Sequence, residues 1–202
     1  MARKRTKQGS ERGTRGSGGI LERLSDAEAA SLLNRLLDLH PELRSEAETL
    51  AAEALSDISV WAVAEEVEWA VLQFDYDDLN GRAGRHSWGY VEPGEAAWEL
   101  LEEAVQPFVD DMKRHLELGL EEQALDLCQG ILLGLYRVRE KSDDDILNWA
   151  PDFPAEKAGD ALGVWANFGR TGRKAGRRLP PEFVAEHIPE WKWVLQSSDK
   201  SR

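Results

Sequence analysis

The sequence predicts an all-α protein, an irregular α-α superhelix of stacked helical hairpins with a less regular C-terminal segment. Apolar residues recur at spacings of three and four over most of the chain between residues 25 and 138, which is the period of an amphipathic helix. Prolines, glycines and N-capping residues interrupt this pattern where helices would end. No stretch alternates apolar and polar residues as a half-buried strand does, so we expect no strand.

The first helix is expected between Ser25 and His40. Ser25 and Glu28 have the S-x-x-E spacing of a capping box, and several leucines follow on one side of the helix. A second helix is expected from Pro41, because proline suits the first turn of a helix. A third is expected after Asp57, a candidate N-cap. Three helices in about fifty residues imply short, antiparallel connections.

The segment 75–94 breaks the helical period and is predicted to be a long loop, since it holds an Asn-Gly pair and further glycines. After Pro93 a strongly periodic helix resumes, with Pro107 inside it and expected to kink it. Gly119 turns the chain into another helix that ends near Lys141. This last helix carries two apolar stripes, so it should pack on both sides.

Composition divides the chain into three parts. Residues 1–19 are rich in Gly, Ser and basic residues, and we expect a disordered basic arm. Residues 20–141 form the helical-repeat-like body. Residues 142–202 are a C-terminal helical extension, with helical stretches near 155–168 and after Pro181, that packs on the body or forms a small lobe.

Charge is distributed unevenly along the chain, whose formal net charge is −13. Residues 20–169 hold 33 acidic and 11 basic residues, whereas residues 1–19 and 170–202 both carry an excess of Lys and Arg. An acidic body repels nucleic acid over most of its surface. Any weak contact with nucleic acid would therefore use the basic ends, including the run GRTGRKAGRR at 169–178.

The sequence contains no recognisable catalytic or cofactor motif. Its four histidines are far apart, so no metal site is expected, and the Asp-rich run that starts at Asp75 departs from a calcium loop at Leu79 and His86. Neither glycine-rich run matches a phosphate-binding loop, so no cofactor is expected. Cys128 lies in an apolar run and is expected to be a buried thiol. Whether the chain is an enzyme stays open.

Polar side chains are concentrated in the predicted loop, at the point where the helical pattern stops. Long loops within helical domains are uncommon and often functional. We therefore predict a binding site here. An alternative is that the two central aspartates of the loop pair with its two arginines and simply hold it in place. The candidate site residues are Asp77, Asp78, Arg82, Arg85, His86 and Trp88.

Two stretches, 40–55 and 89–136, resemble uncharacterised bacterial and archaeal helical proteins, including the helical region that follows SWIM zinc fingers in some of them. This resemblance implies no known activity, and the Cys/His ligands of a SWIM finger are missing here. The paired helices around Gly119 also resemble a tetratricopeptide or HEAT unit, with Trp98 and Leu101 in a W-x-x-L arrangement. Glu102 stands where the tetratricopeptide glycine would be.

Taken together, these patterns favour a protein-protein interaction module or scaffold whose unknown partner carries a basic or amphipathic segment. Uncovered apolar stripes leave room for a homodimer. One alternative is an enzyme of unknown reaction with its site at the 75–93 loop. Another is a nucleic-acid-associated protein that acts through its basic ends. No apolar run is long enough to span a membrane and no secretory signal is evident, so we expect a cytoplasmic protein.

Overall fold

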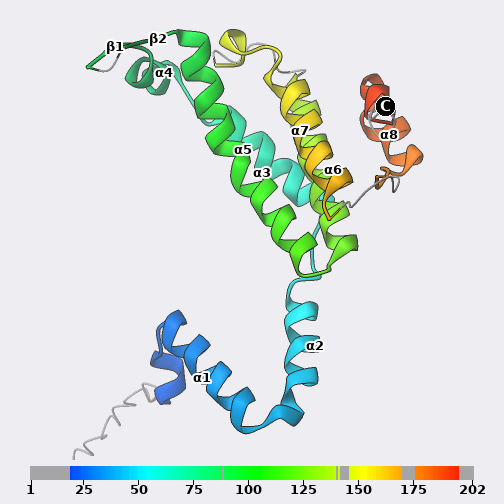
Figure 1. The fold of residues 1–202 in the computed structure, drawn as a ribbon. Coiled ribbons are helices and arrows are strands. Elements are labelled where there is room, and N and C mark those ends of the chain that lie inside the picture. Colours follow the sequence, from blue (N-terminus) through cyan, green and yellow to red (C-terminus); the bar gives the residue numbers. More distant parts are fainter. Residues whose placement is uncertain (1–18, 88, 140, 142–145, 170–175, 196–202) are drawn as a thin grey trace, which may run out of the picture. The chain divides into compact units, whose positions relative to one another are not determined.

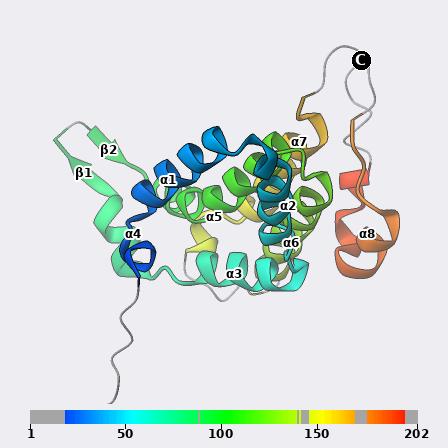
Figure 2. The same ribbon diagram turned by 90° about the horizontal axis from the view of Figure 1, so that it is seen from below.

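A computed structural model describes residues 19–87, 89–139, 141, 146–169 and 176–195 of the chain (Figures 1 and 2). The chain divides into two compact units, Met1–Leu50 and Ala51–Arg202. Each unit is described by itself. Apart from Gly19, the expected basic arm lies outside the described residues.

The first unit contains a short 3₁₀ turn, η1 (Ile20–Arg23), then helix α1 (Asp26–Leu39) and a second 3₁₀ turn, η2 (Pro41–Leu43). The predicted capping box is present. The backbone N–H of Ser25 donates to the Glu28 carboxylate at 2.9 Å, and the backbone N–H of Glu28 donates back to Ser25 Oγ at 3.4 Å. The division between the units falls within the next helix, α2 (Arg44–Ala54).

The second unit holds six more α-helices and one small hairpin among its described residues. These elements are α3 (Val60–Leu72), α4 (Tyr76–Arg82), β1 (Gly84–His86), β2 (Gly89–Val91), α5 (Pro93–Glu117), α6 (Glu121–Arg139), η3 (Leu147–Trp149), α7 (Phe153–Asn167), α8 (Pro181–His187) and η4 (Pro189–Leu195). The chain is therefore an all-α protein of packed helices, as predicted.

Helix α6 is the centre of the core, because α3, α5 and α7 all pack against it (Figures 1 and 2). Its buried residues lie on more than one side, from Ala124 to Val138, which confirms the prediction of two apolar stripes. Gly130 and Gly134 face α3 so closely that an added Cβ would lie 2.6 Å from Val63 or 2.7 Å from the carbonyl oxygen of Ala64. These glycines let the two backbones approach each other.

The described part of the C-terminal region packs on this core. Helix α7 contacts α5 and α6, and its Phe153 ring meets Trp98 edge to face at 5.1 Å between ring centroids. Farther along, Trp191 of η4 meets Tyr136 of α6 edge to face at 5.3 Å. The residues on either side of position 141 thus belong to one compact unit.

The segment predicted to be a long loop is ordered into a helix and a hairpin, so this prediction and the expectation of no strand were both wrong. Helix α4 occupies 76–82, and β1 pairs antiparallel with β2, with Arg85 opposite Tyr90. The helix has only two turns, too short for an apolar period to show, and Leu79 is its one buried residue. Gly84 has φ 103°, a left-handed conformation that favours glycine.

One smaller expectation also needs correction. Ser59, and not Asp57, caps α3, since Ser59 Oγ accepts the backbone N–H of Ala62. Helix α5 continues from Pro93 to Glu117 through Pro107. Within the residues that the structure describes, no helix combines the length and the apolar composition that crossing a membrane would require.

Candidate functional site

The predicted binding residues begin at the N-terminus of α4, where Asp75 is the capping residue. Its carboxylate accepts the backbone N–H groups of Asp77 and Asp78 at 2.8 and 3.1 Å. The Asp78 carboxylate in turn accepts the backbone N–H of Asp75 at 3.0 Å. This capping box satisfies backbone donors that have no partner within the helix. Acidic side chains are also favoured here by the helix dipole.

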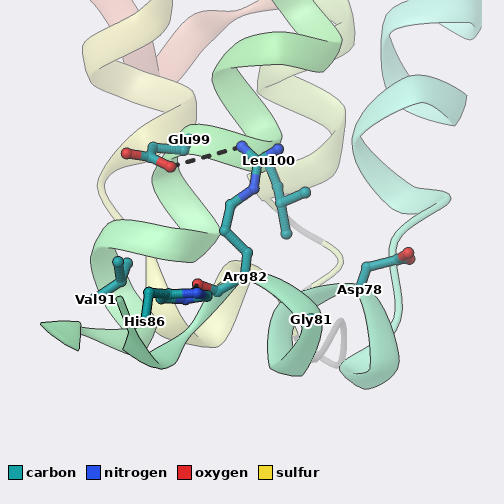
Figure 3. Close-up of a pocket in the computed structure, with 7 residues that line it drawn as sticks. All are labelled: Asp78, Gly81, Arg82, His86, Val91, Glu99 and Leu100. Atoms are coloured by element: carbon teal, nitrogen blue, oxygen red, sulfur yellow. Dashed lines mark hydrogen bonds and ion pairs between the residues drawn. The ribbon is translucent and has the colours of Figure 1, made fainter. Parts of the chain in front are cut away.

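Arg82, in the last turn of α4, reaches across to α5 (Figure 3). Its Nη1 and Nη2 donate to the two carboxylate oxygens of Glu103 at 2.8 and 2.9 Å, and Nη1 lies 3.6 Å from Glu99. This two-pronged geometry is the strong form of an arginine-carboxylate pair. The hydrogen bonds from Arg82 lower the pKa of Glu103, and they raise the pKa of Arg82 itself.

His86, at the end of β1, is held against the C-terminus of α4. Its Nε2 lies 2.7 Å from the backbone carbonyl oxygen of Arg82. A carbonyl oxygen only accepts hydrogen bonds, so Nε2 carries the proton and donates it. That nitrogen is therefore unable to act as a general base in this arrangement.

These side chains line an open hollow of about 480 Å³ between α4, the hairpin and the first half of α5 (Figure 3). Arg82 lies in this hollow beside Glu99, and Glu103 binds Arg82 from the same helix as Glu99, whereas the carboxylate of Asp78 points away from them toward the N-terminus of α4. Val91 and Leu100 add an apolar wall. The lining residues are Asp78, Gly81, Arg82, His86, Val91, Glu99 and Leu100.

The six predicted residues thus have different outcomes. Asp78, Arg82 and His86 come together in the hollow, whereas Asp77 is exposed on the first turn of α4 and does not line it. Arg85 lies on β1 and lines a second open hollow, of about 590 Å³, with His86, Ser87, Gly89 and Tyr90. Trp88 lies outside the described residues.

The alternative of an aspartate-arginine network within the loop is replaced by contacts to α5, since Arg82 binds Glu103 and Glu99. Sequence reasoning missed both glutamates, because it looked for the site within the 75–93 segment and both lie on the next helix. Their spacing of four places them on one face of α5, which is the signal that could have revealed them.

Glu102, the neighbour of Glu103, serves another contact. Lys157 of α7 is buried, and its Nζ donates to the carboxylate of Glu102 at 3.1 Å and to the amide oxygen of Gln106 at 2.9 Å. A buried ammonium group is costly unless it is paired in this way. The adjacent glutamates Glu102 and Glu103 of α5 therefore bind side chains from two different helices, α7 and α4.

The basic run at 169–178 is only partly described, since Arg170, Arg173 and Lys174 lie outside the described residues. Arg177 binds the fold. Its guanidinium donates to the backbone carbonyls of Trp165 and Phe168 at 3.3 and 2.9 Å, and to the Glu121 carboxylate at 2.7 Å. These bonds satisfy carbonyls at the end of α7. Arg177 is thus a structural residue, while its neighbour Arg178 is exposed.

Cys128 is fully buried in α6, and burial raises the pKa of its thiol. Among the described residues, no three or more His, Cys, Asp or Glu side chains are grouped so that they could hold a metal ion. Comparisons with protein-family models, with curated proteins and with solved structures found no match for this chain. The site must therefore be interpreted from its own chemistry.

Proposed function

We propose that this protein is an interaction module, or scaffold, that binds a basic and amphipathic segment of another protein in the hollow between α4 and α5. The observation that carries this proposal is the charge of the hollow. Arg82 is the one arginine among its lining residues, whereas two glutamates of α5, Glu99 and Glu103, lie within ion-pair distance of that arginine. An incoming Lys or Arg side chain would meet an excess of negative charge.

The apolar wall supports the amphipathic part of the proposal. Leu100 is buried and Val91 is partly buried, so a bound apolar side chain would extend an existing packed surface. The acidic character of residues 20–169 would also attract a basic partner from a distance and speed its association. Arg82 orients Glu99 and Glu103, which reduces the entropy lost when the partner binds.

The two alternatives receive less support from the same geometry. For an enzyme at this position, the Nε2 of His86 would not serve as the base, because it donates its proton to the carbonyl oxygen of Arg82. A nucleic-acid role would use the basic ends, 1–19 and 169–178, and among their described residues Arg177 is committed to the end of α7 and to Glu121. An acidic hollow also repels phosphate.

This proposal is tested by fluorescence anisotropy with a labelled synthetic peptide of Lys and Leu residues that forms an amphipathic helix. We expect binding that weakens with salt and weakens roughly 2–5-fold in Glu99→Gln, the loss typical of one exposed charge pair. Glu117→Gln is the matched control, because Glu117 is an exposed glutamate of the same helix about 27 Å away along its axis.

The control separates a site from a general acidic surface. Equal weakening in Glu99→Gln and Glu117→Gln would mean that the whole surface binds without a defined site. Equal binding of a Glu/Leu peptide of the same length would show that the charge of the peptide does not determine binding. Either result would contradict the proposal.

A further inference from the structure

Arg85 is a predicted site residue that the proposed function does not use. It lies on β1, and among the residues that the structure describes its guanidinium has no carboxylate within ion-pair distance. Most described arginines of the second unit do have such a partner: Arg82, Arg114, Arg137, Arg139 and Arg177. Arg85 therefore keeps the hydrogen-bond donors of its guanidinium for a ligand.

The hollow that Arg85 lines differs in chemistry from the hollow beside α4. We call it the hairpin hollow; it measures about 590 Å³, and its described lining of Arg85, His86, Ser87, Gly89 and Tyr90 contains no carboxylate. The guanidinium of Arg85 and the hydroxyls of Ser87 and Tyr90 all have hydrogens to donate. A guanidinium binds a carboxylate through two parallel hydrogen bonds. The hairpin hollow is therefore suited to an acidic side chain.

The hairpin separates the two hollows. Arg85 and Tyr90 are directly opposite each other on the two strands, so their side chains share one face of the hairpin. Side chains alternate between faces along a strand, which places Val91 on the other face, where it lines the hollow beside α4 (Figure 3). His86 lines both hollows. Because paired strands are only about 4.8 Å apart, one segment that passes this narrow hairpin can reach both hollows.

We infer that the partner segment carries an acidic residue near its basic residue, and that Arg85 binds this acidic residue in the hairpin hollow. The inference rests on the proposed function, since the basic residue of the same segment would lie beside Glu99. Arg85 then determines specificity. It repels the lysines of a purely basic segment, whereas a segment that carries both charges meets an opposite charge in each hollow.

A glutamate scan of the helical Lys/Leu peptide tests this inference by fluorescence anisotropy. Each peptide of the scan has one lysine replaced by glutamate, and its counterpart carries glutamine at the same position. We expect at least one position at which Arg85→Gln weakens binding of the glutamate peptide roughly 2–5-fold, the loss typical of one exposed charge pair, without weakening the glutamine peptide. That position gives the spacing of the two charges in the partner.

Two further variants of the full chain provide the controls. Arg178→Gln should leave binding of both peptides unchanged, because Arg178 is also exposed but lines neither hollow. Arg85→Glu should bind the glutamine peptide more tightly than wild type does and the glutamate peptide less tightly, because it puts a carboxylate in place of the guanidinium. Arg85 is exposed, so the far-UV circular dichroism spectra of these variants should match that of wild type.

Glu99→Gln distinguishes failure of this inference from failure of the proposed function. It should weaken binding of the glutamate and glutamine peptides alike, since both keep their other lysines. Equal effects of Arg85→Gln on the two peptides at every position of the scan would overturn the inference and leave the proposed function standing. If no peptide binds, or if Glu99→Gln weakens binding no more than Glu117→Gln does, the proposed function fails and this inference fails with it.

Discussion

The guanidinium of Arg177 makes hydrogen bonds to two backbone carbonyls and one carboxylate, although in the sequence it belongs to a basic run that we considered only as a weak contact for nucleic acid. The charge pattern of a sequence indicates which side chains can lie in solvent. It does not show which of them bind other groups in the folded protein. The carbonyls it binds, of Trp165 and Phe168, become acceptors only once α7 ends there. The role of Arg177 could not be predicted from local sequence for this reason.

Replacing Arg177 with Ala should therefore destabilise the protein. We expect a loss of about 1–3 kcal/mol in the free energy of unfolding, because the carbonyls at the end of α7 lose charged donors. Arg178→Ala should change it by less than about 0.5 kcal/mol, since Arg178 is exposed. Urea unfolding of both variants checks this. Equal stabilities would show that the Arg177 contacts contribute nothing.

Two aspartates should respond to pH with opposite signs. Burial, and then the nearby Glu122, raise the pKa of Asp126, whereas hydrogen bonds from Gln106 and Lys113 lower the pKa of Asp110. A raised carboxyl pKa means that the folded state disfavours the ionised form, so stability is lost as pH rises through that pKa. A lowered pKa gives stability that is present at neutral pH and lost as pH falls.

At pH 7, Asp126→Asn should raise the melting temperature slightly and Asp110→Asn should lower it. The effect of Asp126→Asn should shrink as the pH falls from the raised pKa of Asp126 to the ordinary aspartate pKa of about 3.9, and the effect of Asp110→Asn should shrink only below that value, because each wild-type carboxyl becomes neutral in the folded state there. Thermal unfolding followed by circular dichroism at several pH values measures this. Shifts of the same sign in both variants at pH 7 would mean that the environments of these carboxyls differ from those described.

The candidate site could be predicted from sequence only in part. Asp78, Arg82 and His86 come together because one short helix and one turn bring them there, so their sequence proximity was a sound guide. Glu99 and Glu103 come from the next helix, and their contribution depends on how α4 packs on α5. No local pattern gives that packing.

At the scale of elements, the long helices could be predicted because each presents enough turns for a 3.6-residue period to be visible. Helices α1, α3, α5 and α6 begin or end near the proline, glycine or cap that the sequence indicated. Helix α4 was missed because two turns with one buried leucine give no such period. The hairpin was missed because strands of three residues show no alternation.

The contact of α3 with α6 depends on glycines whose importance the helical pattern did not reveal. Gly134→Ala should destabilise the protein by at least about 1 kcal/mol, because its Cβ would lie 2.7 Å from the Ala64 carbonyl oxygen and 2.8 Å from Val67 Cβ. Gly163→Ala in α7 is the control. An added Cβ there meets nothing within 4 Å, so this change should stabilise by about 0.5–1 kcal/mol through helix propensity.

The free energies of unfolding of the two glycine variants, measured by chemical denaturation, should thus change in opposite directions relative to wild type. If Gly134→Ala were as stable as wild type, α3 and α6 would have room to separate without cost, and the close packing described here would be wrong. If Gly163→Ala were destabilising, a neighbour would have to occupy the open space beside α7.

At the scale of the whole molecule, the composition changes after position 141, and we expected residues 142–202 either to pack on the body or to form a small lobe. The structure keeps the described residues on both sides of it in one compact unit, because the apolar side of α7 packs on α5 and α6. A change in local composition shows where a connecting segment lies in the chain. Whether the helices before and after that segment pack together depends on residues far apart in the chain.

The central claim is that the acidic hollow beside α4 binds a basic, amphipathic segment. Hydrogen exchange of the full chain, read by mass spectrometry with and without the Lys/Leu peptide, tests it most directly. We predict slower exchange in residues 76–87 and in the first half of α5 and no change in α6. At a peptide concentration near the Kd, the effect should be smaller in Glu99→Gln but not in Glu117→Gln. Slower exchange confined to other elements, or none at saturating peptide, would contradict the claim.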